Sequence, residues 1–206
     1  MKSELALSSH LRATSPAILE KTSILIVDGD AMSMTILCQI LAGFGARNLH
    51  KCPTLAQAER LTDRTEIDLL IIDPASVGPR GYDFVPQLRR ASRPPNRFVQ
   101  TVIVTGHTPR SRVQAARDAG ANFVILKPIA PAILLSRIMW MVREKRGFVD
   151  SNTYVGPDRR FKVAGPPAGT VGRRSTDLAS ELGLATDPNL GQLDIDAIVK
   201  PQKVGL

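Results

Sequence analysis

Short runs rich in apolar residues alternate along the chain with longer segments in which apolar positions recur every three or four residues. The short runs lie at residues 23–27, 48–52, 68–72, 101–105 and 123–126. Runs of this length, bounded by turn residues, are typical of strands that are buried in a sheet. The pattern therefore predicts five strands.

The segments that separate these runs have the period of amphipathic helices. We expect helices at residues 31–45, from Thr54 onward, and at 83–91, 110–119 and 130–146. In the last of them the residues expected to face inward are Ile133, Leu134, Ile138 and Val142. Regular alternation of strands and helices predicts an α/β fold with a parallel sheet over residues 22–146.

The two ends of the chain have a different character. Residues 1–21 are interpreted as a flexible leader, and residues 147–206 as a tail rich in Gly, Pro and Arg. The tail lacks an apolar period apart from one candidate short helix at 178–182. Because it can bury little apolar surface, we expect it to be mostly disordered when unbound.

The charge of the chain favours an ordinary solvated surface over a nucleic-acid site. The net charge is +8, but residues 147–206 contain seven basic and seven acidic residues, so the excess is spread over the predicted helices. Aromatic residues make up only 4% of the chain, which leaves no stacking surface for single strands. The tail is too short and too poor in apolar residues for a helix-turn-helix, so direct DNA binding is not expected.

The sequence also indicates in which cellular compartment the protein is expected. It has neither the long apolar run of a membrane-spanning helix nor a secretory signal, so no membrane insertion is expected. Cys38 and Cys52 are its two cysteines. We expect them to be reduced, buried thiols of a cytoplasmic protein rather than a disulfide pair.

Polar residues that can carry chemistry stand where the predicted strands end. Asp28 follows the first strand, Asp73 follows the third, Thr105 ends the fourth and Lys127 follows the fifth. Taken singly, each has an ordinary structural explanation such as a helix cap or a surface charge. Since the carboxyl ends of parallel strands meet at one edge of a sheet, together they predict one site.

Two motifs extend this pattern into a resemblance. Asp73 is followed eight residues later by Gly81, and the stretch AGANFVILKPI surrounds the fifth strand and Lys127. With the strand-end residues, these motifs resemble the receiver domain of two-component response regulators. The resemblance implies a non-enzymatic signalling protein with a flavodoxin-like, doubly wound, five-stranded parallel sheet of order 2-1-3-4-5 and a cis peptide bond before Pro128.

The resemblance also implies roles for the strand-end residues. Asp73 would accept a phosphoryl group from a histidine kinase or phosphotransfer protein. Asp28, Asp73 and the backbone carbonyl of Ala75 would hold Mg²⁺. Lys127 would pair first with carboxylate and then with phosphate, and Thr105 would hydrogen-bond the phosphate and move its loop.

The sequence departs from the receiver pattern at two positions. Gly29 stands where the family has a second acid, and Asp30 replaces that acid only if the glycine lets the backbone bend. Otherwise Mg²⁺ binds weakly and phosphorylation is slow or absent. Val124 occupies the position of the family's aromatic switch residue, with Phe123 beside it on the opposite face of the strand.

The main hypothesis is a stand-alone receiver that acts through protein contacts. A downstream target is expected on the face made by the predicted helix at 110–119, the predicted strand at 123–126 and the predicted helix at 130–146. The residues expected there are Arg110, Arg112, Arg137 and Trp140. The alternative is a receiver-like adaptor that signals without phosphorylation.

The tail supplies a separate hypothesis. Two arginine pairs with nearby Gly and Asp resemble the arginine-rich extensions of chemotaxis-regulator-like effectors that bind cyclic di-GMP. The candidate ligand-binding residues are Asp158, Arg159, Arg160, Arg173 and Arg174. A solvated tail and docking of a partner protein remain the alternatives.

An enzymatic alternative comes from the spacing of Asp28 and Asp30. It matches the DxD motif of haloacid-dehalogenase-like phosphatases, in which the first acid is the nucleophile and the second a general acid/base. However, no acidic pair follows Lys127 to bind a metal, and Asp73 would have no role.

Overall fold

The structure, a computed structural model, describes residues 19–91, 95–106, 108–143, 147–151, 154–158 and 190–199. Its centre is a sheet of five parallel strands: β1 (Ser23–Val27), β2 (Asn48–Cys52), β3 (Leu69–Ile72), β4 (Gln100–Thr105) and β5 (Phe123–Leu126). The strands lie in the order β2-β1-β3-β4-β5. This confirms the predicted fold class and strand order.

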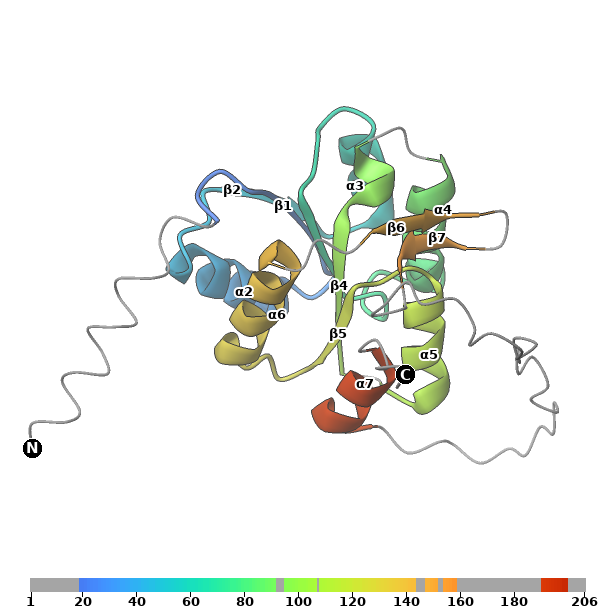
Figure 1. Cartoon of the computed structure of the whole chain (residues 1–206). Coiled ribbons are helices and arrows are strands. Elements are labelled where there is room, and N and C mark those ends of the chain that lie inside the picture. Colours follow the sequence, from blue (N-terminus) through green and yellow to red (C-terminus); the bar gives the residue numbers. More distant parts are fainter. Residues whose placement is uncertain are drawn as a thin grey trace, which may run out of the picture.

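Helices cover both faces of the sheet. They are α2 (Ala31–Gly43), α3 (Leu55–Thr62), α4 (Phe84–Ala91), α5 (Arg110–Asp118) and α6 (Pro131–Arg143). Two short 3₁₀ turns, η1 (Gly81–Asp83) and η2 (Asn96–Phe98), flank α4. Helices α2 and α6 lie on one side of the sheet, and α4 and α5 lie on the other (Figure 1).

Local sequence explains where the helices begin and end. Asp30 caps α2, because its Oδ1 accepts a hydrogen bond of 2.7 Å from the backbone N–H of Ser33. Thr54 caps α3 in the same way. Gly45 and Gly120, which follow α2 and α5, have φ angles of 90° and 95°, a conformation that glycine adopts at little cost.

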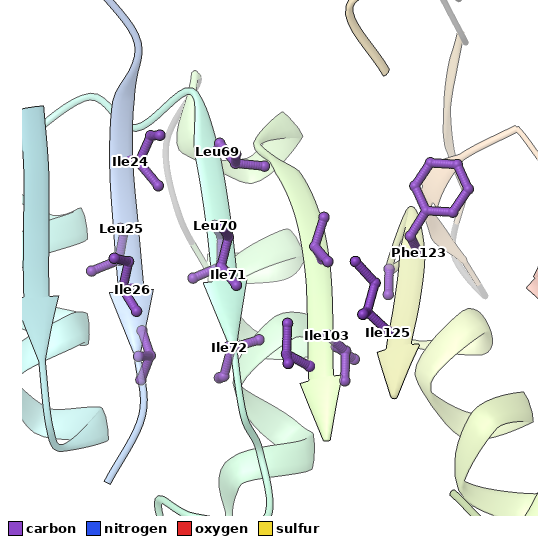
Figure 2. Packing of buried hydrophobic residues seen from close by; sticks show 14 of the residues in the cluster. Ile24, Leu25, Ile26, Leu69, Leu70, Ile71, Ile72, Ile103, Phe123 and Ile125 are labelled. Atoms are coloured by element: carbon purple, nitrogen blue, oxygen red, sulfur yellow. The ribbon is translucent and has the colours of Figure 1, made fainter. Parts of the chain in front are cut away.

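The core lies between the sheet and its helices (Figure 2). All four residues of β3 are buried, as expected for a parallel sheet covered on both faces. In α6, Leu134, Ile138 and Met141 point inward, whereas Val142 is 58% exposed. The prediction for Val142 was therefore wrong, because Met141 occupies the inward position in that turn.

The C-terminal part of the chain contains regular structure that the sequence did not predict. Strands β6 (Phe148–Asp150) and β7 (Val155–Pro157) form an antiparallel pair, and α7 spans Gln192–Val199. These segments pack against the sheet domain, where α7 contacts α5 and β5 and β7 contacts α4. The expectation that the tail is mostly disordered stays a prediction, because most of residues 147–206 lie outside the described part of the chain. The candidate helix at 178–182 lies outside the described residues.

The leader also ends earlier than predicted. Leu19 is 2% exposed and belongs to the core, and its carbonyl accepts a hydrogen bond from the N–H of Thr22. Residues 1–18 lie outside the described part of the chain. Within that described part, none of the helices combines the length and the apolar character needed to span a membrane.

Candidate functional site

Three of the predicted strand-end residues meet at the carboxyl edge of the sheet. The Nζ atom of Lys127 lies 2.9 Å from Oδ2 of Asp28 and 2.6 Å from Oδ2 of Asp73. The two carboxylates are almost fully buried, with exposed fractions of 2% and 7%. They follow the neighbouring strands β1 and β3, and Lys127 reaches them from the end of β5. One ammonium group therefore bridges two buried carboxylates.

Asp28 is held in its charged form. Burial tends to raise its pKa, but hydrogen bonds from the Ser33 hydroxyl, the Asp30 backbone N–H and Lys127 outweigh burial and lower the pKa. The Ser33 hydroxyl lies 2.6 Å from Oδ2 and the Asp30 nitrogen 2.9 Å from Oδ1. Asp28 is thus an ionised carboxylate at neutral pH.

Asp73 is fixed by the loop that follows β3. Its Oδ1 accepts a hydrogen bond of 2.9 Å from the N–H of Ala75, and its carbonyl accepts one of 3.0 Å from the Ser76 hydroxyl. Burial tends to lower the pKa of Lys127, but its pairing with Asp73 and Asp28 raises the pKa. The cluster of two carboxylates and one ammonium therefore retains one negative charge.

Thr105 lies at the same edge of the sheet. It is the last residue of β4, it is buried, and its carbonyl accepts a hydrogen bond of 3.0 Å from the N–H of Lys127. The Lys127–Pro128 peptide bond is cis, as predicted. This backbone hydrogen bond therefore fixes the end of β4 against the residue that follows β5.

Gly29 is required by the close approach of another loop. Its N–H donates a hydrogen bond of 2.8 Å to the Ser76 hydroxyl. A Cβ atom at position 29 would lie 2.2 Å from the carbonyl oxygen of Ser76 and 3.0 Å from its carbonyl carbon. The loop after β3 thus fills the space of the acid that the receiver pattern has at this position.

Asp30 as a replacement for the missing acid stays a prediction, and in this structure Asp30 serves as a helix cap. Its carboxylate caps α2, and only its backbone N–H contacts Asp28. Among the described residues, no group of three or more acidic, histidine or cysteine side chains could hold a metal ion. The oxygen donors suit Mg²⁺ in kind but are one carboxylate short of the receiver set.

The spacing between Asp73 and Gly81 also has a structural reason. The loop after β3 folds back on itself, and a Cβ atom at position 81 would lie 1.9 Å from the carbonyl oxygen of Pro74. Only glycine fits there.

The sequence did not indicate the two hydroxyl residues of the site, Ser33 and Ser76. Ser33 stands three residues after Asp30, which is the usual spacing between a helix cap and the backbone N–H that it binds.

The face predicted for a downstream target is not open in this structure, because α7 packs against α5 and β5. The guanidinium of Arg137 lies 5.3 Å from the ring centre of Phe123 and is ion-paired with Asp196 of α7. Trp140 contacts Phe123 edge-on at 5.2 Å. Arg112 lies 4.6 Å from the ring of Tyr82, and Arg110 is exposed.

The arginine motif of the tail falls largely outside the described residues. Asp158 ends the β6–β7 hairpin, where its N–H donates a hydrogen bond of 2.8 Å to the carbonyl of Gly147. The other four candidates lie outside the described residues: Arg159, Arg160, Arg173 and Arg174. Binding of cyclic di-GMP therefore stays a prediction.

The DxD interpretation finds no support in the geometry. It requires Asp30 as a general acid/base, but the carboxylate of Asp30 caps a helix. It leaves Asp73 without a role, but Asp73 shares Lys127 with Asp28. The arrangement instead suits a reaction in which a buried carboxylate gains an anionic group beside a lysine.

Comparison with known proteins agrees with this geometry. The nitrate/nitrite response regulator protein NarP of Escherichia coli (strain K12) is 30% identical over 128 residues, which are 62% of this chain and 58% of NarP. The chain thus matches little more than half of that relative's length.

Two solved structures share the fold. A signal receiver domain of a two-component histidine kinase from Clostridium thermocellum has 20% identity and a TM-score of 0.54, covering 60% of this chain and 99% of its own. A CheY-like receiver domain protein from Methanospirillum hungatei JF-1 has 22% identity and a TM-score of 0.53, covering 59% and 94%. The family model for the response regulator receiver domain matches residues 24–139, and the chain belongs to this family.

Proposed function

We propose that this chain is a phosphoacceptor of a two-component phosphorelay, in which Asp73 receives the phosphoryl group and the domain then acts through protein contacts. Receiver domains are generally non-enzymatic signalling modules that interact with histidine kinases or phosphotransfer proteins and with downstream targets. The observation that carries the proposal is the bridge from Lys127 to both Asp73 and Asp28.

The proposed transfer uses groups that the structure already positions. An oxygen of Asp73 attacks the phosphorus of a phosphohistidine, and the P–N bond breaks with its electron pair passing to the imidazole nitrogen, which takes up a proton. Lys127 provides the positive charge beside the new acyl phosphate, and Asp28 holds Lys127 in place.

Mg²⁺ would add neutralisation of the phosphoryl oxygens when it is bound. Asp28, Asp73 and the carbonyl of Ala75 are the groups that would hold it. Because Gly29 supplies no carboxylate, we expect weaker Mg²⁺ binding than a receiver with two adjacent acids would show.

A protein phosphodonor is supported by an apolar patch beside the site. Met32 and Ile36, one turn apart on α2, are 74% and 46% exposed. Helix α2 begins three residues after Asp28, so a partner that covers this patch would lie next to the acidic cluster. Exposed apolar side chains in such a position are typical of a contact surface.

The test is incubation of the protein with acetyl phosphate and Mg²⁺, followed by intact mass measurement. We expect a single phosphoryl adduct on the unmodified chain and none on the Asp73→Asn variant. Asp83→Asn is the matched control, because Asp83 is exposed and lies ten residues further along the chain. An equal adduct on the Asp73→Asn variant would exclude Asp73 as the acceptor.

The second candidate is the adaptor that signals without phosphorylation. It is favoured by the packing of Ser76 against Gly29 and by the contact of Lys127 with both carboxylates, which compensates one of their two negative charges. Repeating the mass measurement over a rising Mg²⁺ concentration separates the candidates. Absence of an adduct at every concentration supports the adaptor.

A further inference from the structure

Helix α7 lies against the face that we predicted for a downstream target. It is separated from α6 by a long stretch of chain, yet it packs beside α5 and β5 (Figure 1). We call the surface formed by α5, β5 and α6 the output groove.

The first contact lies at the free edge of the sheet. Strand β5 lies at one end of the five-stranded sheet, so among the described residues one of its edges has no strand partner. The side-chain amide of Gln192 binds this edge: its Oε1 accepts a hydrogen bond of 2.8 Å from the N–H of Leu126, and its Nε2 donates one of 3.1 Å to the carbonyl of Val124. Gln192 thus satisfies backbone groups that an added strand would otherwise pair.

The next contacts follow one face of α7. Ile195 and Val199 are buried, with exposed fractions of 0% and 6%. Asp196 forms an ion pair with Arg137 of α6. Leu193, on the other side of α7, is 86% exposed. The groove therefore contacts four residues on one face of α7: an amide at position i, an apolar residue at i+3, an acid at i+4 and an apolar residue at i+7.

The segment that precedes α7 is bound to a loop of the acidic site. Leu190 and Thr108 exchange two hydrogen bonds: the Leu190 N–H donates to the Thr108 carbonyl at 2.8 Å, and the Thr108 hydroxyl donates to the Leu190 carbonyl at 2.9 Å. Thr108 lies in the loop that follows Thr105. The groove and the acidic site therefore share the segments around Thr105 and Lys127.

We propose that the output groove is a helix-docking surface which α7 closes in cis, and that the downstream partner binds by presenting a helix with the same Gln-x-x-Ile-Asp-x-x-Val chemistry in place of α7. This inference deepens the proposed function, because it specifies the chemistry of the partner. Specificity comes from Arg137, which favours an acid, and from the β5 edge, which pairs with a group that both donates and accepts hydrogen bonds, as the Gln192 amide does.

The size of α7 makes exchange feasible. It has eight residues, and isolated helices of this length are not stable in water. Its docked state therefore depends on the groove, and tethering gives it a local concentration on the order of millimolar. A free partner helix competes well only when this internal contact is weakened.

The experiment uses the full chain and two variants. Asp196→Arg places a guanidinium against Arg137 and should release α7, whereas Leu193→Arg adds the same group on the exposed side of α7 and should not. Amide exchange of Leu126, followed by NMR, reports on the Gln192 contact. We expect exchange about tenfold faster in Asp196→Arg and unchanged in Leu193→Arg. The double variant Arg137→Asp/Asp196→Arg restores the pairing and should restore protection.

Binding in trans is measured with a fluorescent peptide of residues 188–201. We expect it to bind the Asp196→Arg chain at least about tenfold more tightly than the unmodified chain, in which α7 fills the groove. Equal binding to both chains, no binding to either, or equal Leu126 exchange in both single variants would overturn the proposal. The phosphorylation test is independent of these results, because Asp196→Arg leaves Asp73 in place.

Discussion

Gly29 determines how many carboxylates the acidic site contains, because the loop after β3 packs directly against it. The hydrogen bond from its N–H to Ser76 and the missing space for a Cβ atom come from the same contact. A side chain at this position must push the loop that carries Asp73. The packing of this loop therefore leaves no room for a second acid at position 29.

The substitution Gly29→Asp tests this relation. We expect a loss of about 2 kcal/mol in the free energy of unfolding, because the new Cβ overlaps the backbone of Ser76. Gly43→Ala is the matched control: a Cβ at position 43, at the end of α2, meets no atom within 4 Å, and alanine should stabilise the helix by about 0.5 kcal/mol. Urea denaturation measures both, and an equally stable Gly29→Asp variant would contradict the packing argument.

Lys127 holds the two buried carboxylates together. In a Lys127→Met variant, Asp28 and Asp73 would lose their shared positive partner and repel each other in a buried place. We expect a loss of about 3 kcal/mol in unfolding free energy at neutral pH. Adding Asp28→Asn to this variant removes one of the two charges and should recover part of the loss; no recovery would argue against direct coupling.

The pH dependence of stability follows from the two pKa shifts. The pKa of Asp28 is lowered, so its contribution is present above its unfolded pKa of about 3.9 and is lost as the pH falls through the lower folded value. The pKa of Lys127 is raised, so its contribution is present below its unfolded pKa of about 10.4 and is lost as the pH rises through the higher folded value. Chemical denaturation in a pH series should show both losses, and Lys127→Met should lack the alkaline one.

At the scale of elements, sequence patterns predicted the strands and helices of residues 22–146 well. The runs at 23–27, 48–52 and 123–126 match β1, β2 and β5, because apolar runs and turn residues act locally. They could not predict α7 or the β6–β7 hairpin. These elements depend on distant contacts, such as the ion pair of Arg97 with Asp150 at 3.0 Å.

Arg89 of α4 shows how such distant contacts join elements. Its side chain is 1% exposed and donates hydrogen bonds to the carbonyl of Arg97, the hydroxyl of Thr101 and the carbonyl of Gly120. Its guanidinium also lies 5.0 Å from the ring centre of Phe148 in β6. Burial lowers its pKa to about 10, so it remains charged at neutral pH. The sequence predicted an ordinary solvated surface for the basic residues of the helices, so it did not indicate that Arg89 is buried.

The substitution Arg89→Met keeps much of the buried volume but leaves three acceptors without their donor. We expect a loss of about 3 kcal/mol in unfolding free energy. Arg90→Met is the control, since Arg90 is the neighbouring residue of α4 and is exposed. Thermal or urea unfolding compares the two, and equal effects would show that the buried hydrogen bonds of Arg89 contribute little.

At the scale of the whole molecule, one parallel sheet places the acidic site at its carboxyl edge and the output groove beside its last strand. The order of strands made the meeting of Asp28, Asp73 and Lys127 predictable. The role of Asp30 was not predictable, because an acid after a strand suits both a metal ligand and a helix cap. The closed groove was not predictable either, since nothing local in α7 indicates which surface it contacts.

Whether Asp73 is the phosphoacceptor is tested by locating the phosphoryl group. After incubation with acetyl phosphate and Mg²⁺, borohydride reduction of the acyl phosphate marks the modified aspartate, and peptide mass spectrometry identifies it. We predict the mark on Asp73 and its absence from Asp28. A mark on Asp28, as a DxD nucleophile would carry, would contradict the assignment of Asp73 as the phosphoacceptor.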